Sequence, residues 1–481
     1  MHQFTARASW PRTILSTAAL GLLLAACAPS GNAAAIAAAT ERPEAVPRTV
    51  AFVGVNVVPM DRERVLEAHT VVVEDGRIVS VAPSDAARVP EGAQRIDGIG
   101  RWLMPGLAEM HGHVPGADDP EYAEDVLFLY VSNGVTTVRN MAGSASHLAL
   151  RERIARGDLP GPTLHAASPW LSDETAGTPE RAEQMVREYH AAGFDLIKLG
   201  GIPPEAYARM AQTAHALGMP FAGHVPGEVG LVGALDARQA SIDHFDRYAE
   251  FLAAEGTGFA TRDKGFFGSG VVDLVDTARI PEAVARTLAA GTWNVPTLSL
   301  VEHLASPEPA ESMIEWPEMR YMPKRVRDGW VAAKRDMQSR DTFRPAAAQR
   351  LVEVRRQLLK ALHDAEAPIA LGSDAPQFFN VPGFSIHHEM RMMAAAGLTP
   401  FDVLATGTRE PARYFNTPEA FGTVEPGRRA DLILLEANPL DDLANVRRRV
   451  GVMVRGRWWP EEEIQSRLQE IAEAVAGRDA G

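Results

Sequence analysis

The chain has 481 residues, of which 46% are hydrophobic and 23% charged, so it can bury a large core and is not a disordered protein. Its net charge of −14 argues against a nucleic-acid partner, because an acidic surface repels phosphates. A single cysteine excludes an intrachain disulfide and a thiolate metal site built from several cysteines.

Residues 1–26 predict a lipoprotein signal peptide. Arg7 and Arg12 precede an apolar stretch, residues 14–26, that is too short to span a bilayer as a permanent helix. It ends in Leu-Ala-Ala followed by Cys27, which resembles a bacterial lipobox and implies that Cys27 is lipidated. Plain secretion with a chance cysteine at the cleavage site is the alternative.

Residues 27–47 are rich in Ala, Pro and Gly and predict a tether. The expected location is outside the cytoplasm, with the chain attached to a membrane through Cys27. We expect the periplasmic face of the outer membrane, since Ala28 is not the aspartate that commonly marks inner-membrane retention.

Valine-rich runs near both ends predict one small β-sandwich domain, built from residues 48–103 and 419–460. Residues 49–59 and 70–82 are strand-like, and Asp75-Gly76 is a strong hairpin signal. Residues 430–436 and 450–459 show the same strand-like apolar pattern.

Between these runs, residues 104–418 alternate strand-like and helical patterns, which is typical of βα units. Eight such strands predict an α/β fold, a closed (β/α)8 TIM-like barrel with its chemistry at the carboxyl ends of the strands. An open doubly wound sheet is the alternative, but no Gly-rich nucleotide fingerprint follows any strand. The expected strands are Gly106–His113, Gly134–Asn140, Thr163–Leu171, Asp195–Gly200, Pro220–Val225, Ser241–Phe245, Trp293–Val301 and Pro368–Asp374.

Two further segments lie outside this alternation. Residues 302–367 are longer than one crossover needs and predict helical cover over the barrel mouth, although an ordinary surface insertion would look the same. Residues 461–481 predict a C-terminal helix or tail.

The strongest local signal is the run MPGLAEMHGH, which ends in His111 and His113. Two histidines two apart on a strand point the same way and can reach one cation at its end. Alone, this motif is weak, because two ordinary polar residues would give the same pattern.

Four later strands also finish with metal-ligand side chains, namely Lys198, His224, His244 and Asp374. Barrel geometry would bring them to the same point as the first pair. A lone buried histidine is more often only hydrogen-bonded, but the full set favours a metal site.

This pattern resembles the amidohydrolase superfamily, with H-x-H on strand one, Lys on strand four, His on strands five and six and Asp on strand eight. The tail GTVEPG followed by ADL resembles the family's closing motif. The runs KLGG, GHVPG and LGSDA, with a later helix carrying His387, His388 and Glu389, look most like its prolidase-like and imidazolonepropionase-like branches.

The resemblance implies a metal-dependent hydrolase, and ligands of this kind suit Zn²⁺, with Mn²⁺, Co²⁺ or Fe²⁺ possible. In two-metal members the first ion is held by the strand-one histidines and the strand-eight aspartate, here His111, His113 and Asp374. The second would be held by His224 and His244. A carbamylated lysine, here Lys198, bridges them, whereas one-metal members of the imidazolonepropionase branch leave that lysine unmodified.

The resemblance also implies Asp374 as the catalytic proton carrier. Four residues near the expected mouth are candidates to bind substrate, Tyr248, Arg247, His165 and His303. We expect hydrolysis of the amide C–N bond of a small molecule, such as a dipeptide or N-acyl amino acid.

A cyclic amidase or lactonase is the nearest alternative activity. A non-catalytic anchored binding lipoprotein would predict a broken ligand set, whereas every expected position is filled. The sequence leaves a homo-oligomer open.

Overall fold

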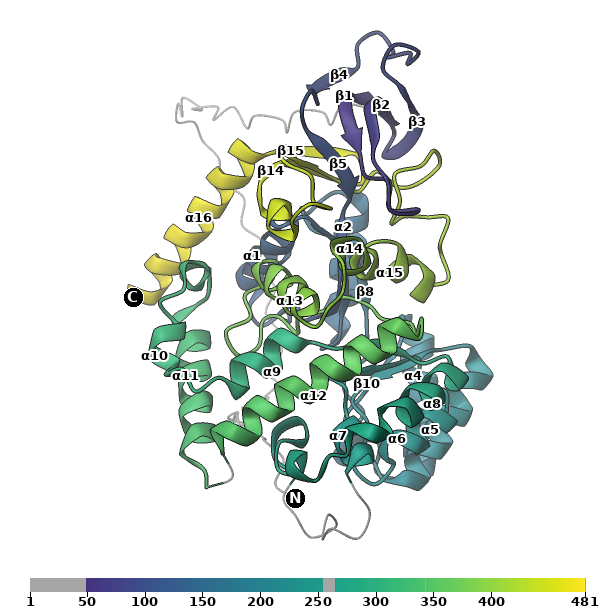
Figure 1. Ribbon diagram of the computed structural model, residues 1–481, viewed down its shortest axis with the longest axis vertical. Coiled ribbons are helices and arrows are strands. Elements are labelled where there is room, and N and C mark those ends of the chain that lie inside the picture. Colours follow the sequence, from purple (N-terminus) through teal and green to yellow (C-terminus); the bar gives the residue numbers. More distant parts are fainter. Residues whose placement is uncertain (1–48, 254–263, 342, 481) are drawn as a thin grey trace, which may run out of the picture. The chain divides into compact units, whose positions relative to one another are not determined.

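The computed structural model describes residues 49–253, 264–341 and 343–480, all within one compact unit, Pro47–Gly481 (Figure 1). The predicted signal peptide, tether and lipidation site at Cys27 lie outside the described residues. No helix within the described ranges is long and apolar enough to cross a membrane.

The centre of the chain contains two parallel sheets that hold the first seven predicted barrel strands. Their strands are shorter than predicted, but they begin and end within the predicted ranges. The first sheet has the order β6-β7-β8 and the second the order β12-β11-β10-β9. The strands are β6 (Leu107–Gly112), β7 (Val135–Asn140), β8 (Thr163–Ala166), β9 (Ile197–Leu199), β10 (Phe221–Gly223), β11 (Ser241–Asp243) and β12 (Trp293–Val295).

Parallel bridges close these two sheets into a barrel. On one side, Ala167 pairs with Leu196 and thereby links β8 to β9. On the other side, the segment 368–375 lies between β12 and β6, since Ile369 pairs with Asn294 and Ala375 with Gly112. This segment is the eighth barrel strand, and the predicted (β/α)8 architecture is confirmed.

Helices connect the barrel strands, and their ends carry ordinary start and stop signals. In α4 (Pro179–Ala192), the Thr178 hydroxyl accepts the Arg181 N–H, and Gly193 at φ 87° ends the helix in a left-handed conformation. The other helices of this part are α1 (Pro120–Ser132), α2 (Ala145–Arg156), α3 (Asp173–Ala176), α5 (Pro204–Leu217), α6 (Gly230–Asp236), α7 (Tyr248–Leu252) and α8 (Ile280–Ala290), with short 3-10 turns at Phe266–Gly268, Val272–Leu274 and Thr277–Arg279.

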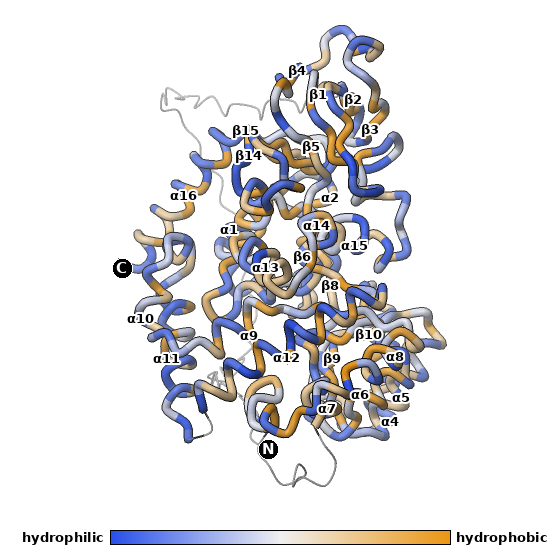
Figure 2. The backbone as a smooth tube through the Cα atoms, viewed as in Figure 1, coloured by the Kyte–Doolittle hydropathy of each residue, from blue (hydrophilic) through white to orange (hydrophobic). Residues whose placement is uncertain are grey.

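The segment predicted as cover over the barrel mouth is helical. It contains α9 (Leu298–Ala305), α10 (Ala310–Met313), a 3-10 turn at Pro317–Tyr321, α11 (Lys324–Ser339) and α12 (Pro345–Asp364). Figure 2 shows hydrophilic and hydrophobic residues alternating along α11 and α12. In α12 the buried residues Leu351, Val354 and Leu358 recur at helical spacing, so this helix packs one apolar face inward.

The predicted seventh strand, Trp293–Val301, was too long. It ends at Val295, and α9 begins at Leu298 because the buried Glu389 carboxylate accepts the N–H groups of Leu298 (2.8 Å) and Ser299 (2.7 Å). At the other end of α9, the buried Lys334 ammonium donates to the carbonyl of His303 at 2.5 Å. Both charges have the sign that the helix dipole favours.

The two ends of the described chain join in one eight-stranded sheet, in the order β15-β14-β13-β5-β1-β2-β3, with β4 paired to β1. The N-terminal and C-terminal strands meet where β5 runs antiparallel to β13. The predicted β domain from both ends is therefore present. Its strands are β1 (Thr49–Val57), β2 (Leu66–Glu74), β3 (Arg77–Pro83), β4 (Gln94–Asp97), β5 (Trp102–Pro105), β13 (Leu432–Leu435), β14 (Arg449–Val454) and β15 (Arg457–Pro460).

The remaining helices lie in the C-terminal quarter of the chain. They are α13 (Phe384–Ala395), α14 (Pro400–Gly407), α15 (Arg409–Tyr414), a 3-10 turn at Leu443–Arg447 and α16 (Glu461–Ala480). The last of these fills the segment predicted as a C-terminal helix or tail.

Candidate metal centre

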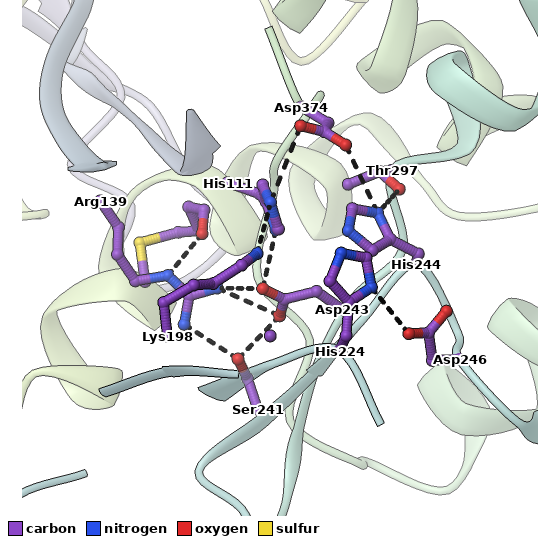
Figure 3. Close-up of polar contacts among 12 residues, drawn as sticks. His111, Arg139, Lys198, His224, Ser241, Asp243, His244, Asp246, Thr297 and Asp374 are labelled. Carbon is purple, nitrogen blue, oxygen red and sulfur yellow. Dashed lines mark hydrogen bonds and ion pairs between the residues drawn. The ribbon is translucent and has the colours of Figure 1, made fainter. Parts of the chain in front are cut away.

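The six predicted ligands lie together at the carboxyl ends of the barrel strands, and we call them the ligand cluster (Figure 3). Each lies in, or directly after, a short buried barrel strand, so the barrel itself aims the side chains at one point. The cluster consists of His111, His113, Lys198, His224, His244 and Asp374, all of which except His113 are labelled in Figure 3.

One half of the cluster is a compact group of three. Ligand atoms of His111, His113 and Asp374 all lie within 4.8 Å of one another. His113 Nε2 is 2.5 Å from Asp374 Oδ1, and His111 Nε2 is 3.7 Å from the same oxygen. Two imidazoles and a carboxylate converging in this way form a donor set suited to a divalent cation.

The other half lies directly beside it. Lys198 Nζ is 3.3 Å from His111 Nε2, and the ring centroids of His224 and His244 are 4.9 Å apart. His244 also approaches the first half, with Nδ1 3.7 Å from Asp374 Oδ2. The structure therefore brings all six predicted residues together.

Three of the histidines have their Nδ1 atom hydrogen-bonded to an oxygen. His111 Nδ1 donates to Asp243 (2.7 Å), His224 Nδ1 donates to Asp246 (2.9 Å), and His244 Nδ1 shares a hydrogen bond with the Thr297 hydroxyl (2.8 Å). The two carboxylates place the Nε2 lone pairs of His111 and His224 on the cluster side, as is usual for imidazoles that ligate metals, and His111 Nε2 there meets Lys198 Nζ. The residues present thus fit a metal centre.

A fully buried arginine, which the sequence analysis missed, supports the ligand cluster through Asp243, the partner of His111. Arg139 in β7 donates to both carboxylate oxygens of Asp243, at 3.1 and 3.0 Å, and to the carbonyl of Met110 at 2.5 Å. Arg139 and Asp243 could have been noticed as charged residues inside strands that otherwise read as buried.

The protonation states favour a bound cation. Burial and the neighbouring positive charges hold the pKa values of His111 and His244 well below the ordinary range, so both imidazoles are neutral. Burial alone would raise the pKa of Asp243, but the charges of Arg139 and Lys198 outweigh it and lower that pKa. Burial lowers the pKa of Lys198 to about 8.

The comparisons with known proteins can be read against this geometry. A model of the amidohydrolase family matches residues 102–459, which span the whole barrel and both parts of the ligand cluster. The chain belongs to the amidohydrolase family. It is therefore a hydrolase that acts on carbon–nitrogen bonds, and its family is metal-dependent.

Similar proteins and solved structures cover most of the chain. An imidazolonepropionase from Klebsiella pneumoniae is 26% identical over 383 residues, covering 77% of this chain and 87% of that protein. A putative prolidase from Bifidobacterium longum superposes with a TM-score of 0.66 at 23% identity, covering 89% and 99% of the two chains. A Xaa-Pro dipeptidase with bound methionine gives a TM-score of 0.64 at 20% identity, covering 86% and 100%. These structural likenesses support the amidohydrolase fold.

A second missed residue of this amidohydrolase, Glu109, joins the first and last barrel strands. Its carboxylate accepts the Ser373 N–H (2.8 Å), the His111 N–H (3.1 Å) and the Ser373 hydroxyl (2.5 Å). Burial raises the pKa of Glu109 to about 8. It thus ties together the backbones that carry His111 and Asp374.

Of the four predicted substrate-binding residues, only Arg247 lies beside a cluster residue with part of its side chain exposed. Its Nε donates to the carbonyl of Val225, the residue after His224, at 2.9 Å, and its Nη1 bonds Glu250 at 2.9 Å. Arg247 therefore braces the loop that carries His224.

The structure does not bring the other three to the cluster. Tyr248 is buried and its hydroxyl bonds Thr287 of α8 at 2.7 Å, so its position does not support contact with substrate. His165 stacks on Phe415, with ring centroids 3.7 Å apart, and burial lowers its pKa to about 4. His303, which was predicted to follow the seventh strand, is buried in α9, and burial lowers its pKa to about 3.

Proposed function

We propose that the chain is a two-zinc amidohydrolase that cleaves the amide C–N bond of a small substrate, such as a dipeptide or N-acyl amino acid. The observation that carries the proposal is the fully buried Lys198, whose Nζ lies 3.3 Å from His111 Nε2 among histidines from three strands. A buried ammonium beside several metal ligands is costly, whereas a lysine carbamate would add a negative ligand there.

The proposed ligand assignment follows the two halves of the cluster. His111, His113 and Asp374 would hold one ion, His224 and His244 would hold another, and a carbamylated Lys198 would supply a further negative ligand. Reaction of the neutral Lys198 amine with CO₂ forms a carbamate and releases one proton, so the bridge needs no other reagent. Bound divalent cations would lower the pKa of a water molecule to near neutrality and polarise the substrate carbonyl.

The remaining chemistry falls to side chains of the chain itself. Asp374, whose carboxylate lies between His113 and His244, accepts a proton from the attacking water and passes it to the leaving nitrogen. Asp243, Asp246 and Thr297 hold the imidazoles in the orientation that keeps Nε2 available.

The choice between linear and cyclic amides depends on the number of metals. The solved structures named prolidase and Xaa-Pro dipeptidase favour a linear peptide bond, whereas the relative named imidazolonepropionase favours a cyclic amide. The contact of Lys198 Nζ with His111 Nε2, across the two halves, favours the linear substrate, because it suits the proposed pair of ions.

Elemental mass spectrometry of the purified chain tests the proposal. We expect two zinc ions per chain in the parent, one or none in Lys198→Ala, and two in the control Lys360→Ala, whose lysine lies in an ion pair on α12. One ion in parent and Lys198→Ala alike would make Lys198 a bystander and favour cyclic amides. No metal in any variant would rule out the mechanism.

We also propose that the chain is exported and anchored through lipidated Cys27, on the periplasmic face of the outer membrane. The support is the lipobox-like run before Cys27. Incorporation of labelled palmitate into the parent but not into Cys27→Ser, with fractionation of the membranes, tests it. Equal labelling of both forms would contradict the anchor.

A further inference from the structure

An exposed tryptophan stands at the edge of the ligand cluster. Trp170 lies in the loop between β8 and α3, and 43% of its surface is exposed. Among the described residues it is the one aromatic member of the exposed large hydrophobic side chains. That set is Val79, Ile99, Trp170, Val232 and Leu288.

The indole lies directly against the metal-site residues. Its ring centroid is 5.4 Å from that of His224 and 5.0 Å from Lys198 Nζ. The side chain of His224 is 28% exposed, whereas those of His111 and His244 are each 1% exposed. Solvent, and therefore substrate, reaches this half of the cluster beside Trp170.

The loop is fixed to the strand that carries Lys198, so the indole is held in place. The N–H of Leu171 donates to the carbonyl of Lys198 (3.0 Å), and the N–H of Gly200 donates to the carbonyl of Leu171 (2.9 Å). A Cβ at Gly200 would lie 2.8 Å from the Leu171 carbonyl and 3.4 Å from Trp170 Cε3. The lack of a side chain at Gly200 therefore allows the close approach of the loop.

We propose that Trp170 is the apolar wall of a substrate subsite that receives a ring-bearing or branched apolar group next to the scissile C–N bond. This inference rests on the proposed function and adds the substrate class. A rigid aromatic surface left exposed beside the reaction centre gains its hydrophobic stabilisation only when an apolar group covers it. Loss of such a wall should cost about 10- to 100-fold in kcat/KM for apolar substrates.

Three dipeptides test the wall, namely glycyl-glycine and two that each differ from it at one position, glycyl-proline and phenylalanyl-glycine. We expect Trp170→Ala to lower kcat/KM about 10- to 100-fold for at least one apolar dipeptide, and less than about threefold for glycyl-glycine. Trp170→Phe keeps a ring and should stay within about fivefold of the parent. Leu288→Ala, which removes an exposed apolar side chain on α8, should behave as the parent.

Metal content separates the wall from a structural role. Each variant should hold as many metal ions as the parent. An equal loss on all three dipeptides, or a loss of metal in Trp170→Ala, would mean that the indole supports Lys198 or His224 and would overturn the proposal. Unchanged kinetics would overturn it too.

Binding measurements keep this inference separate from the proposed function. If the parent hydrolyses none of the dipeptides, the proposed activity fails, but calorimetry with the same ligands still tests the wall. Tighter binding of an apolar dipeptide than of glycyl-glycine, lost in Trp170→Ala and kept in Trp170→Phe, supports it. Equal binding by parent and Trp170→Ala, or no binding by the parent, contradicts it.

Discussion

Two carboxylate–histidine pairs support the ligand cluster, and they differ in their surroundings. The pair of Asp243 with His111 is buried and rests on the guanidinium of Arg139. The pair of Asp246 with His224 is partly exposed, and the Asp246 carboxylate also accepts the N–H of Val225. The buried carboxylate is compensated by direct hydrogen bonds from Arg139, whereas the outer carboxylate is compensated by the N–H of Val225 and the nearby charge of Arg247. One side of the centre is therefore rigid support, and the other faces the substrate.

The largest effect should follow from removing the compensating charge of the buried pair. Arg139→Met removes the guanidinium that compensates the buried Asp243 carboxylate, so the free energy of unfolding should fall by about 3–5 kcal/mol. Urea unfolding of the metal-free chain measures this. The control Arg187→Met breaks an exposed helical pair with Glu183 and should leave the free energy of unfolding almost unchanged, because solvent screens such pairs. Equal losses in both variants would erase the distinction between buried and exposed pairs.

The stability of the folded chain should also depend on pH through Glu109, which lies on the buried side of the cluster. Its folded-state pKa of about 8 lies above the ordinary value, so the protonated acid stabilises the folded chain at low pH. This contribution is lost as pH rises from about 4.5 to about 8, and it amounts to a few kcal/mol, since one pKa unit corresponds to about 1.4 kcal/mol. Metal-free parent and Glu109→Gln should therefore differ in the slope of stability against pH. Parallel curves would contradict this assignment.

Metal affinity compares the two pairs directly. Asp243→Asn should weaken the affinity for a divalent cation about 10- to 100-fold, because the His111 imidazole loses its charged partner and Arg139 is left unpaired. Asp246→Asn should weaken it by about tenfold or less, because solvent replaces part of the lost interaction. Competition with a chromophoric chelator gives both values. A larger loss in Asp246→Asn would reverse the comparison.

The smallest effect concerns Tyr248, which belongs to neither pair. Tyr248→Phe removes the hydroxyl bonded to Thr287 and should lower the free energy of unfolding by about 1 kcal/mol. KM for the best substrate should not change. A raised KM with unchanged stability would return Tyr248 to the substrate site, as the sequence had suggested.

The ligand cluster was accessible from the sequence because its members follow apolar strands. Each of His224, His244 and Asp374 comes directly after a short run of buried residues, where a barrel places its chemistry. The eight strands could be counted for the same reason. The start of α9 could not be foreseen, because the Glu389 carboxylate that fixes it comes from a distant part of the chain.

The support beneath the cluster was hidden for a related reason. Arg139, Glu109 and Asp243 act through partners on other strands, so no local spacing reveals them. The substrate residues were the least predictable. Position after a strand does not say which way a side chain turns, and Tyr248 turns toward α8.

The positioning of α9 depends on two charged side chains, Glu389 and Lys334, that follow it in the sequence. Thr297, which orients His244, directly precedes a helix whose start is fixed by Glu389 and whose end is fixed by Lys334. A nascent chain that has not yet been extended to Glu389 already contains every ligand residue but lacks the anchor that positions one of them. A chain truncated before Glu389 should therefore hold the His244 imidazole less firmly and retain metal less well than the full chain.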